Sequence, residues 1–206
     1  MPDHAHLTAF LAAALVLAIT PGPGIFYVLA RSLGEGTRVG VRSSLGTALG
    51  GLCHVVAAAV GLSTLLMTSA TAFEVVRCAG AAYLVFLGAK TLLGLRDEAA
   101  ATPRERGDAF RQGVLTELLN PKTALFFLTF LPQFAQPERG AVAPQLLALG
   151  AVSVTLNSSA DLVVAAVAGR ARGMLRAGSR WVRRQRAFSG VALIALGGYA
   201  AVGDRR

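Results

Sequence analysis

Charged side chains are scarce in this sequence. Asp, Glu, Lys and Arg make up 15% of the 206 residues, while apolar residues make up 54% and the mean hydropathy is +0.57. A soluble domain usually carries about 25% charged residues, and low charge combined with high hydropathy also excludes intrinsic disorder. The composition therefore indicates a membrane protein, and the length suits a single polytopic domain over residues 1–206.

Residues that hold metals or carry out covalent chemistry are also few. There are two cysteines and three histidines, and Cys53 and Cys78 lie in apolar segments without metal-ligand spacing. The sequence contains no phosphate-binding loop, zinc motif or nucleophile elbow. We therefore expect no metal site, no cofactor and no enzymatic activity, and an ion gradient as the energy source instead of ATP bound by this chain.

Long apolar runs are what the sequence has instead. A stretch of about 20 apolar residues crosses a bilayer as a helix. Six runs approach or exceed this length, and they predict an all-α membrane protein with six transmembrane helices. The runs cover, to within a few residues, 5–30, 43–66, 73–95, 112–135, 143–169 and 187–203.

The basic residues predict how these helices are oriented. Most of the 20 Lys and Arg residues lie in every second connection, after the first, third and fifth runs. Cytoplasmic loops of membrane proteins hold the excess of Lys and Arg. We therefore expect a cell (inner) membrane protein with both termini outside. The net charge of +9, which in a soluble protein would suggest nucleic acid, is here a topology signal, and no nucleic-acid partner is expected.

Two of the six runs contain residues that break a helix. Thr-Pro-Gly-Pro-Gly stands at residues 20–24 of the first run, and Asn-Pro-Lys stands at 120–122 of the fourth. Proline removes a backbone donor and clashes with the preceding turn. Unpaired backbone at membrane depth is tolerated only where it is buried in protein or lines a cavity. We therefore expect the first and fourth spans to be broken helices beside a cavity.

The two breaks also resemble each other. Ile-Thr-Pro at 19–21, followed by Ile-Phe-Tyr at 25–27, parallels Leu-Asn-Pro at 119–121, followed by Leu-Phe-Phe at 125–127. Each half of the chain, about 5–95 and 112–203, would hold three spans, so the second half would be inverted relative to the first. Two inverted three-helix repeats with matching broken helices are typical of a transporter with its site at the repeat interface.

Four features fall at one depth in the predicted membrane. Counted from the nearest basic loop at about 1.5 Å per residue, Pro21, Pro121, Asp161 and His54 lie near the middle of a hydrocarbon core of roughly 30 Å. An acid at that depth is costly and needs a reason. Asp161 is therefore a candidate proton carrier or ligand for a substrate ammonium, the alternative being a structural ion pair. His54 is a second proton-coupling candidate, with a packing role as its alternative.

Lys122 is placed at the same level by the second break. It could hold a substrate carboxylate or pair with Asp161, the alternative being that its side chain reaches the cytoplasmic side. Glu117 lies nearer that side, where it could line an entrance or be a solvated charge at a helix end. The amides freed at the breaks would suit a zwitterion. The candidate substrate-binding residues are Thr20, Pro21, Gly22, Pro23, Gly24, Asn120, Pro121, Lys122 and Asn157.

These motifs resemble the LysE family of exporters, in particular its homoserine/threonine-exporter (RhtB) branch. The similar segments are 20–24, 36–61, 79–90 and 120–134, within a likeness that runs from about residue 6 to 203. The resemblance implies an inner-membrane exporter of amino acids or their derivatives, driven by the proton-motive force, with 21–23 and 120–122 near the transport route. The chain departs from the family pattern at Gly24, where Asn is common, and at Gly51, where a polar or acidic residue is common.

The sequence thus predicts a translocator that exchanges a small zwitterionic amino acid, or a derivative of one, for protons across a lipid bilayer. One alternative is a metal-cation exporter of the same superfamily, which would need several inward-facing carboxylates, His or Cys. The other is a membrane-embedded enzyme or assembly subunit, which would need a paired acid and base. A homodimer is left open, because 206 residues is small for a transport route.

Overall fold

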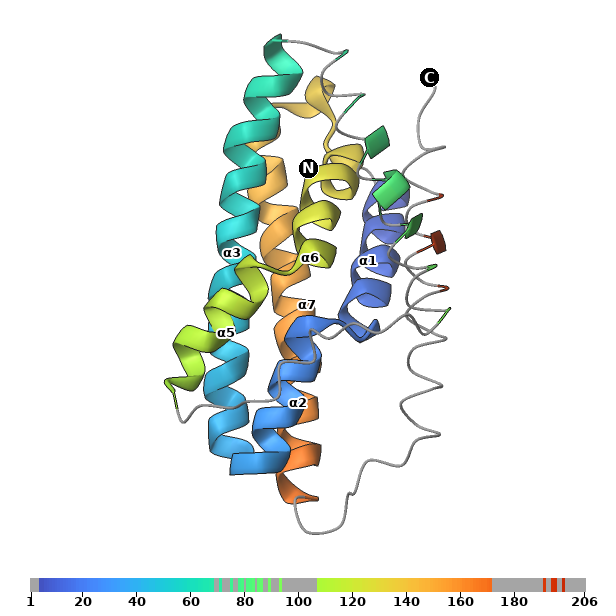
Figure 1. Cartoon of the computed structure of the whole chain (residues 1–206). Coiled ribbons are helices and arrows are strands. Elements are labelled where there is room, and N and C mark those ends of the chain that lie inside the picture. Colours follow the sequence, from blue (N-terminus) through green and yellow to red (C-terminus); the bar gives the residue numbers. More distant parts are fainter. Residues whose placement is uncertain are drawn as a thin grey trace.

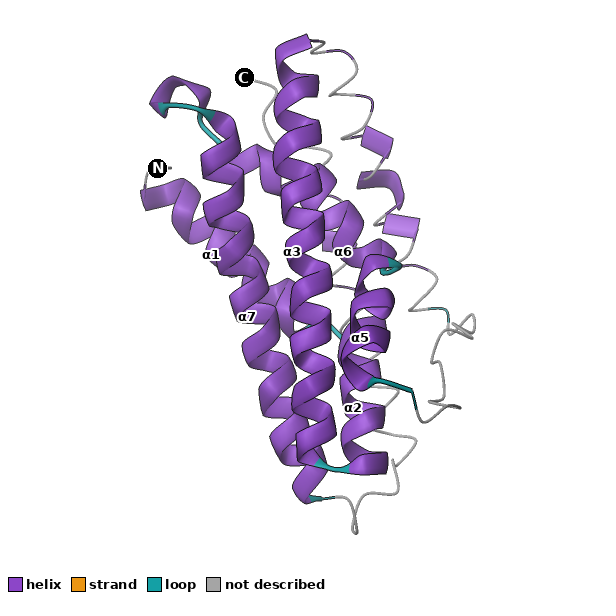
Figure 2. Cartoon of the chain, turned by 90° about the vertical axis from the view of Figure 1, so that its left-hand side faces the viewer, coloured by secondary structure: helices purple, strands orange, loops and turns teal. Residues whose placement is uncertain are grey.

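The computed structural model describes residues 4–68 and 107–171, together with scattered positions between 71 and 93 and between 191 and 198. In this described part every regular element is helical and none is a strand (Figures 1 and 2), so the predicted all-α class is confirmed. Of the predicted third and sixth spans, 73–95 and 187–203, only scattered positions belong to the described residues. The six-span inverted repeat therefore stays a prediction.

Two long helices lie side by side through the length of the molecule. They are α3 (Thr37–Thr68) and α7 (Val142–Arg170). Thr37–Gly61 within α3 has 25 residues and α7 has 29, and both are apolar enough to cross a membrane. Both correspond to predicted spans. Their outward faces carry exposed apolar side chains, such as Val60 and Val163, which suits contact with lipid.

The first predicted span is broken where its sequence indicates. α1 (His4–Ile19) and α2 (Pro23–Glu35) are separated by three residues and bent by 44° from each other. Pro23 stands at the first position of α2, where a missing N–H is tolerated because no helical carbonyl precedes it. The predicted break in span one is confirmed.

The fourth predicted span is broken as well. α5 (Ala109–Leu118) is followed, at an angle of 49°, by α6 (Pro121–Leu125), which continues as a π-helical turn η1 (Phe126–Phe130) and a 3-10 turn η2 (Leu131–Phe134). A short 3-10 turn η3 (Pro137–Arg139) leads to α7. The two bent pairs would each make one membrane span, which gives up to four spans in the described part.

Aromatic packing holds the two bent pairs against each other. Phe10 of α1 meets Phe134 of η2 edge to face, with ring centroids 5.5 Å apart. Phe130 contacts Phe134 at 5.0 Å and Phe126 at 5.1 Å. All four rings are buried. Such rings bury large areas, so this cluster packs α1, the first half of one bent pair, against η1 and η2, the last part of the other.

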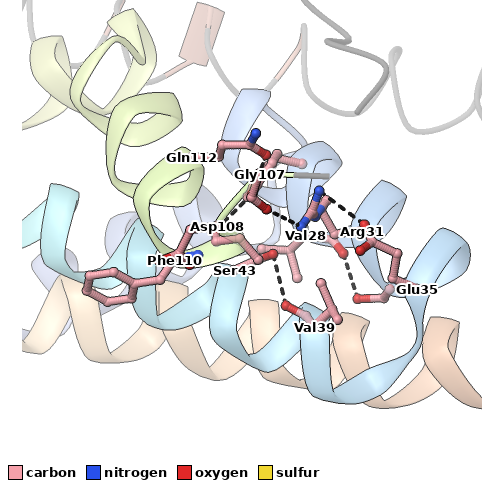
Figure 3. A network of polar contacts seen from close by, with 12 residues as sticks. Val28, Arg31, Glu35, Val39, Ser43, Gly107, Asp108, Phe110 and Gln112 are labelled. Carbon is pink, nitrogen blue, oxygen red and sulfur yellow. Dashed lines mark hydrogen bonds and ion pairs between the residues drawn. The ribbon is translucent and has the colours of Figure 1, made fainter. Parts of the chain in front are cut away.

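A polar seam ties α2 to the beginning of α5, away from the breaks. Arg31 is 2% exposed, donates to the carbonyl of Gly107 at 3.1 Å and pairs with Glu35 at 3.0 Å (Figure 3). One turn earlier on α2, the Tyr27 hydroxyl donates to the carbonyl of Ala109 at 2.9 Å. The seam therefore joins α2, the second half of the first broken span, to α5, the first half of the other broken span.

Glycines bring α3 and α5 into backbone contact. A Cβ on Gly46 would overlap the carbonyl oxygen of Phe110, and a Cβ on Gly50 would lie 2.9 Å from the carbonyl oxygen of Val114. The Gly46-x-x-x-Gly50 spacing is therefore a packing motif.

We predict that Gly46→Ala lowers the stability of the purified protein by about 1–3 kcal/mol, the usual range for overpacking. The obstacle is a backbone carbonyl, which can move only if α3 and α5 separate. Gly34→Ala is the matched control, since nothing lies within 4 Å of the added methyl group and alanine favours a helix. Thermal melting in detergent measures both, and equal melting temperatures would contradict the packing role.

Candidate functional site

A cavity lies where the two breaks meet the middle of α3 and α7. Its lining comes from all four predicted spans in the described part, with polar and charged groups set among small apolar ones. The structure thus brings residues beside both breaks together with Asp161 at one cavity, whereas their common depth in a membrane stays a prediction. The residues that line it are Ala18, Gly24, Ile25, Thr47, Ala48, Gly51, Glu117, Asn120, Lys122, Val154, Asn157, Ser158 and Asp161.

The structure brings some predicted site residues into the cavity wall and leaves others beside it. Thr20 is buried, and its hydroxyl donates to the carbonyl of Val16 in the last turn of α1. His54 is half-buried, with Nε2 3.0 Å from the carbonyl oxygen of Glu117, and is not part of the wall. This contact favours the packing role for His54. The predicted residues in the wall are Gly24, Asn120, Lys122, Asn157 and Asp161, whereas Thr20, Pro21, Gly22, Pro23 and Pro121 form the breaks beside it.

Lys122 completes the end of α1. Its Nζ donates to the carbonyl oxygens of Thr20 at 2.8 Å and Leu17 at 3.3 Å. The last carbonyls of a helix have no partner within the helix, and a cation there is favourable. Gly22 keeps room for the side chain, because a Cβ on Gly22 would lie 3.0 Å from Cε of Lys122. Lys122 is only 6% exposed, so it does not reach the surface.

Asn120 organises the second break. Its Oδ1 accepts from the backbone N–H of Lys122 at 3.1 Å, so that Asn120 caps α6. Its Nδ2 donates to Oε2 of Glu117 at 3.1 Å and to Oγ1 of Thr123 at 3.0 Å. One side chain thus satisfies groups on both sides of the bend.

Glu117 is a further residue of the cavity wall. It is 5% exposed and lines the cavity, so the expectation of a solvated charge at a helix end is wrong. Besides the bond from Asn120, its Oε1 accepts from Oγ1 of Thr123 at 2.6 Å. A Cβ on Gly24 would lie 2.5 Å from Oε2 of Glu117. The sequence signal for this contact was the three-residue spacing of Glu117, Asn120 and Thr123 around Pro121.

Asp161 shares its hydrogen-bond partner with a backbone carbonyl. Its Oδ2 lies 2.9 Å from Oγ1 of Thr47, which also lies 2.9 Å from the carbonyl oxygen of Ser44. A hydroxyl has one proton to donate and can accept as well. When Asp161 is ionised, Thr47 donates to it; when Asp161 is protonated, Asp161 donates to Thr47, whose own proton turns to Ser44. No ion pair joins Asp161 to Lys122 among the described residues.

The side chains that line the described part of the cavity can bind a ligand, but they do not form a group that could carry out covalent chemistry or hold a metal ion. No three potential metal ligands cluster within the described ranges. Charged groups buried beside two broken helices in an otherwise apolar bundle define the class as a multi-pass membrane transport protein. The comparison with known sequences gives the family.

The chain belongs to the LysE type translocator family, which it matches over residues 15–203. An uncharacterised membrane protein of Vibrio cholerae is 33% identical, with 87% of this chain and 89% of the relative covered. The homoserine/homoserine lactone efflux proteins of Salmonella typhimurium and Salmonella typhi are each 30% identical, with 90% of this chain and 91% of each relative covered. No solved structure shows a significant match. The protein is therefore a translocator and not an enzyme.

We predict that Asn120→Ala destabilises the protein much more than Asn157→Ala does. The first change removes a helix cap, which alone costs about 0.5–2 kcal/mol, and leaves Oε2 of the buried Glu117 carboxylate without its donor. Asn157 lines the same cavity, but its side chain makes no hydrogen bond within the described part. Melting temperatures of the two variants in the same detergent measure the difference, and similar losses would show that Asn120 does not hold the break.

Proposed function

We propose that this translocator exports a small amino acid, or a derivative that keeps its amino group, in exchange for protons. The observation that carries the proposal is the gathering of Glu117, Lys122 and Asp161 around one cavity at both helix breaks. Two Salmonella relatives are named as efflux proteins for homoserine and homoserine lactone, which supports a substrate of this size and chemistry.

In this proposal the amino group of the substrate binds Asp161. Oδ1 of Asp161 has no hydrogen-bond partner in the described part, so it can accept from an ammonium. The carbonyl or carboxyl end of the substrate then faces Lys122, which keeps one N–H after its two backbone bonds, and the start of α2 at Gly24. The prolines at 21, 23 and 121 act by holding the breaks open.

The proton is carried by Asp161 in the same proposal. An ammonium and a proton compete for one carboxylate, so the substrate leaves when the proton arrives from outside. The hydroxyl of Thr47 accommodates both states by turning between Asp161 and the carbonyl of Ser44. Glu117 and Lys122 are the other charged groups that line the cavity. His54 packs against backbone outside the wall, so we assign it no part in coupling.

The membrane arrangement completes the proposal. We infer six spans in two inverted halves, in the inner membrane, with both termini outside. The two broken spans support the inverted halves, since they stand at matching positions. A second copy of the chain remains our suggestion for closing the route.

We predict that cells expressing this chain and preloaded with amino acids by dipeptide feeding release one or a few of them, or their derivatives, into the medium. Release is expected to fall when an uncoupler is added, because the proton gradient drives it. Mass spectrometry of the medium measures both effects. With the protein confirmed in the membrane, the absence of any released amino compound would overturn the proposed substrate class.

We predict that Asp161→Asn uncouples transport from the proton gradient. The amide keeps the shape and can still bond Thr47, but it cannot take up a proton. In reconstituted vesicles, an imposed pH gradient should accelerate export by the wild type at least about tenfold more than export by the variant. A tenfold difference corresponds to about 1.4 kcal/mol. Asp108→Asn is the matched control, because Asp108 caps α5 and Asn caps helices equally well. Equal acceleration in both variants would remove Asp161 from the coupling step.

A further inference from the structure

The described wall of the cavity holds one more acid than base. Glu117, Asp161 and Lys122 are its charged residues, and each is less than a tenth exposed. A buried charge without a partner is costly. The surplus therefore has to be met by something that enters the cavity, and which acid carries it decides what that is.

Both carboxylate oxygens of Glu117 face hydrogen-bond donors. Nδ2 of Asn120 donates one proton to Oε2 of Glu117 and the other to Oγ1 of Thr123. Since Thr123 accepts there, its own proton is free for Oε1 of Glu117, 2.6 Å away. Both carboxylate oxygens thus accept, and a carboxylic acid proton would find donors only. The amide of Asn120 cannot be reversed, because its Oδ1 already accepts from the N–H of Lys122.

Asp161 differs from Glu117 in this respect. Its partner Thr47 can donate or accept, since the hydroxyl has a second acceptor at the carbonyl of Ser44. The hydrogen bonds around Glu117 therefore suit a carboxylate alone, whereas those around Asp161 suit either form. With Lys122 as the one base, a protonated Asp161 leaves the cavity neutral and an ionised Asp161 leaves it with one negative charge.

The fixed charge of Glu117 also acts on whatever occupies the cavity. Gly24 places no side chain between Glu117 and the wall of α2, and the carboxylate is itself part of the lining. A charge in the wall of a protein site acts on a bound ligand more strongly than the same charge does in water. A substrate carboxylate would be disfavoured, and a substrate ammonium favoured.

We propose that Glu117 makes the cavity selective for a singly charged organic cation: a primary amine whose carboxyl group is blocked as an amide, ester or lactone. Such a molecule neutralises the cavity as one proton on Asp161 does, so the two exchange one for one. A zwitterion adds a second carboxylate near Glu117 and binds less well. This inference rests on the proposed function, because it takes the cavity as the transport site.

The test compares an amino acid with its primary amide in reconstituted vesicles. Vesicles with wild type, Glu117→Gln, Glu117→Asp or the control Glu138→Gln are loaded with an equal mixture of the two compounds, at a mildly acidic pH where both amines are protonated. Protein-free vesicles correct for leakage of the amide. Glu138 is an exposed residue of η3, outside the cavity. Mass spectrometry gives the ratio of amide to amino acid released.

We expect the wild type, Glu117→Asp and Glu138→Gln to release more amide than amino acid. Glu117→Gln should lower that ratio about tenfold, which corresponds to about 1.4 kcal/mol. A wild-type preference for the free amino acid, or an unchanged ratio in Glu117→Gln, would overturn the role of Glu117 and leave the exporter intact. Release of neither compound by the wild type would instead count against the proposed function. If Glu117→Gln does not fold, the wild-type ratio and that of Glu117→Asp decide.

Discussion

The structure depends on satisfying the backbone groups that two helix breaks free inside an apolar bundle. Water is not there to bind them, so the protein has to supply partners at the same depth. Lys122 supplies them for the end of α1 and Asn120 for the beginning of α6. Once these polar side chains are present at mid-depth, further polar groups can be buried beside them at lower cost. The cavity is the result, because the breaks concentrate polarity at one level of an otherwise hydrophobic molecule.

Within that level the hydrogen bonds separate fixed charges from adjustable ones. Glu117 receives two donors, and Lys122 donates to two carbonyls, so the hydrogen bonds of both suit their charged forms. Asp161 meets a hydroxyl that can reverse its direction. A carrier needs both kinds of group: fixed charges keep the site selective throughout a cycle, and one adjustable charge lets two ligands alternate.

Much of this arrangement could be predicted from the sequence, because helix breakers and apolar runs act locally. The breaks beside Pro21 and Pro121 and the long helices α3 and α7 follow from the sequence read along the chain. Such counting gives a position along a helix axis but not the rotation about it. His54 therefore lies outside the cavity wall, and Glu117, expected as a charge near a helix end, is buried in that wall. The bond from Lys122 to α1 spans more than a hundred residues and leaves no local pattern to read.

That long-range bond also bears on how the chain is made. The carbonyls at the end of α1 belong to residues 17 and 20, and their partner is residue 122. During synthesis the first span is therefore complete in sequence long before its break is complete in structure. Until the fourth predicted span enters the membrane, the carbonyl of Thr20 lacks this donor and the carbonyl of Leu17 has only the N–H of Thr20. The first helix pair is consequently a late-maturing element, and the arrival of Lys122 is the step that closes it.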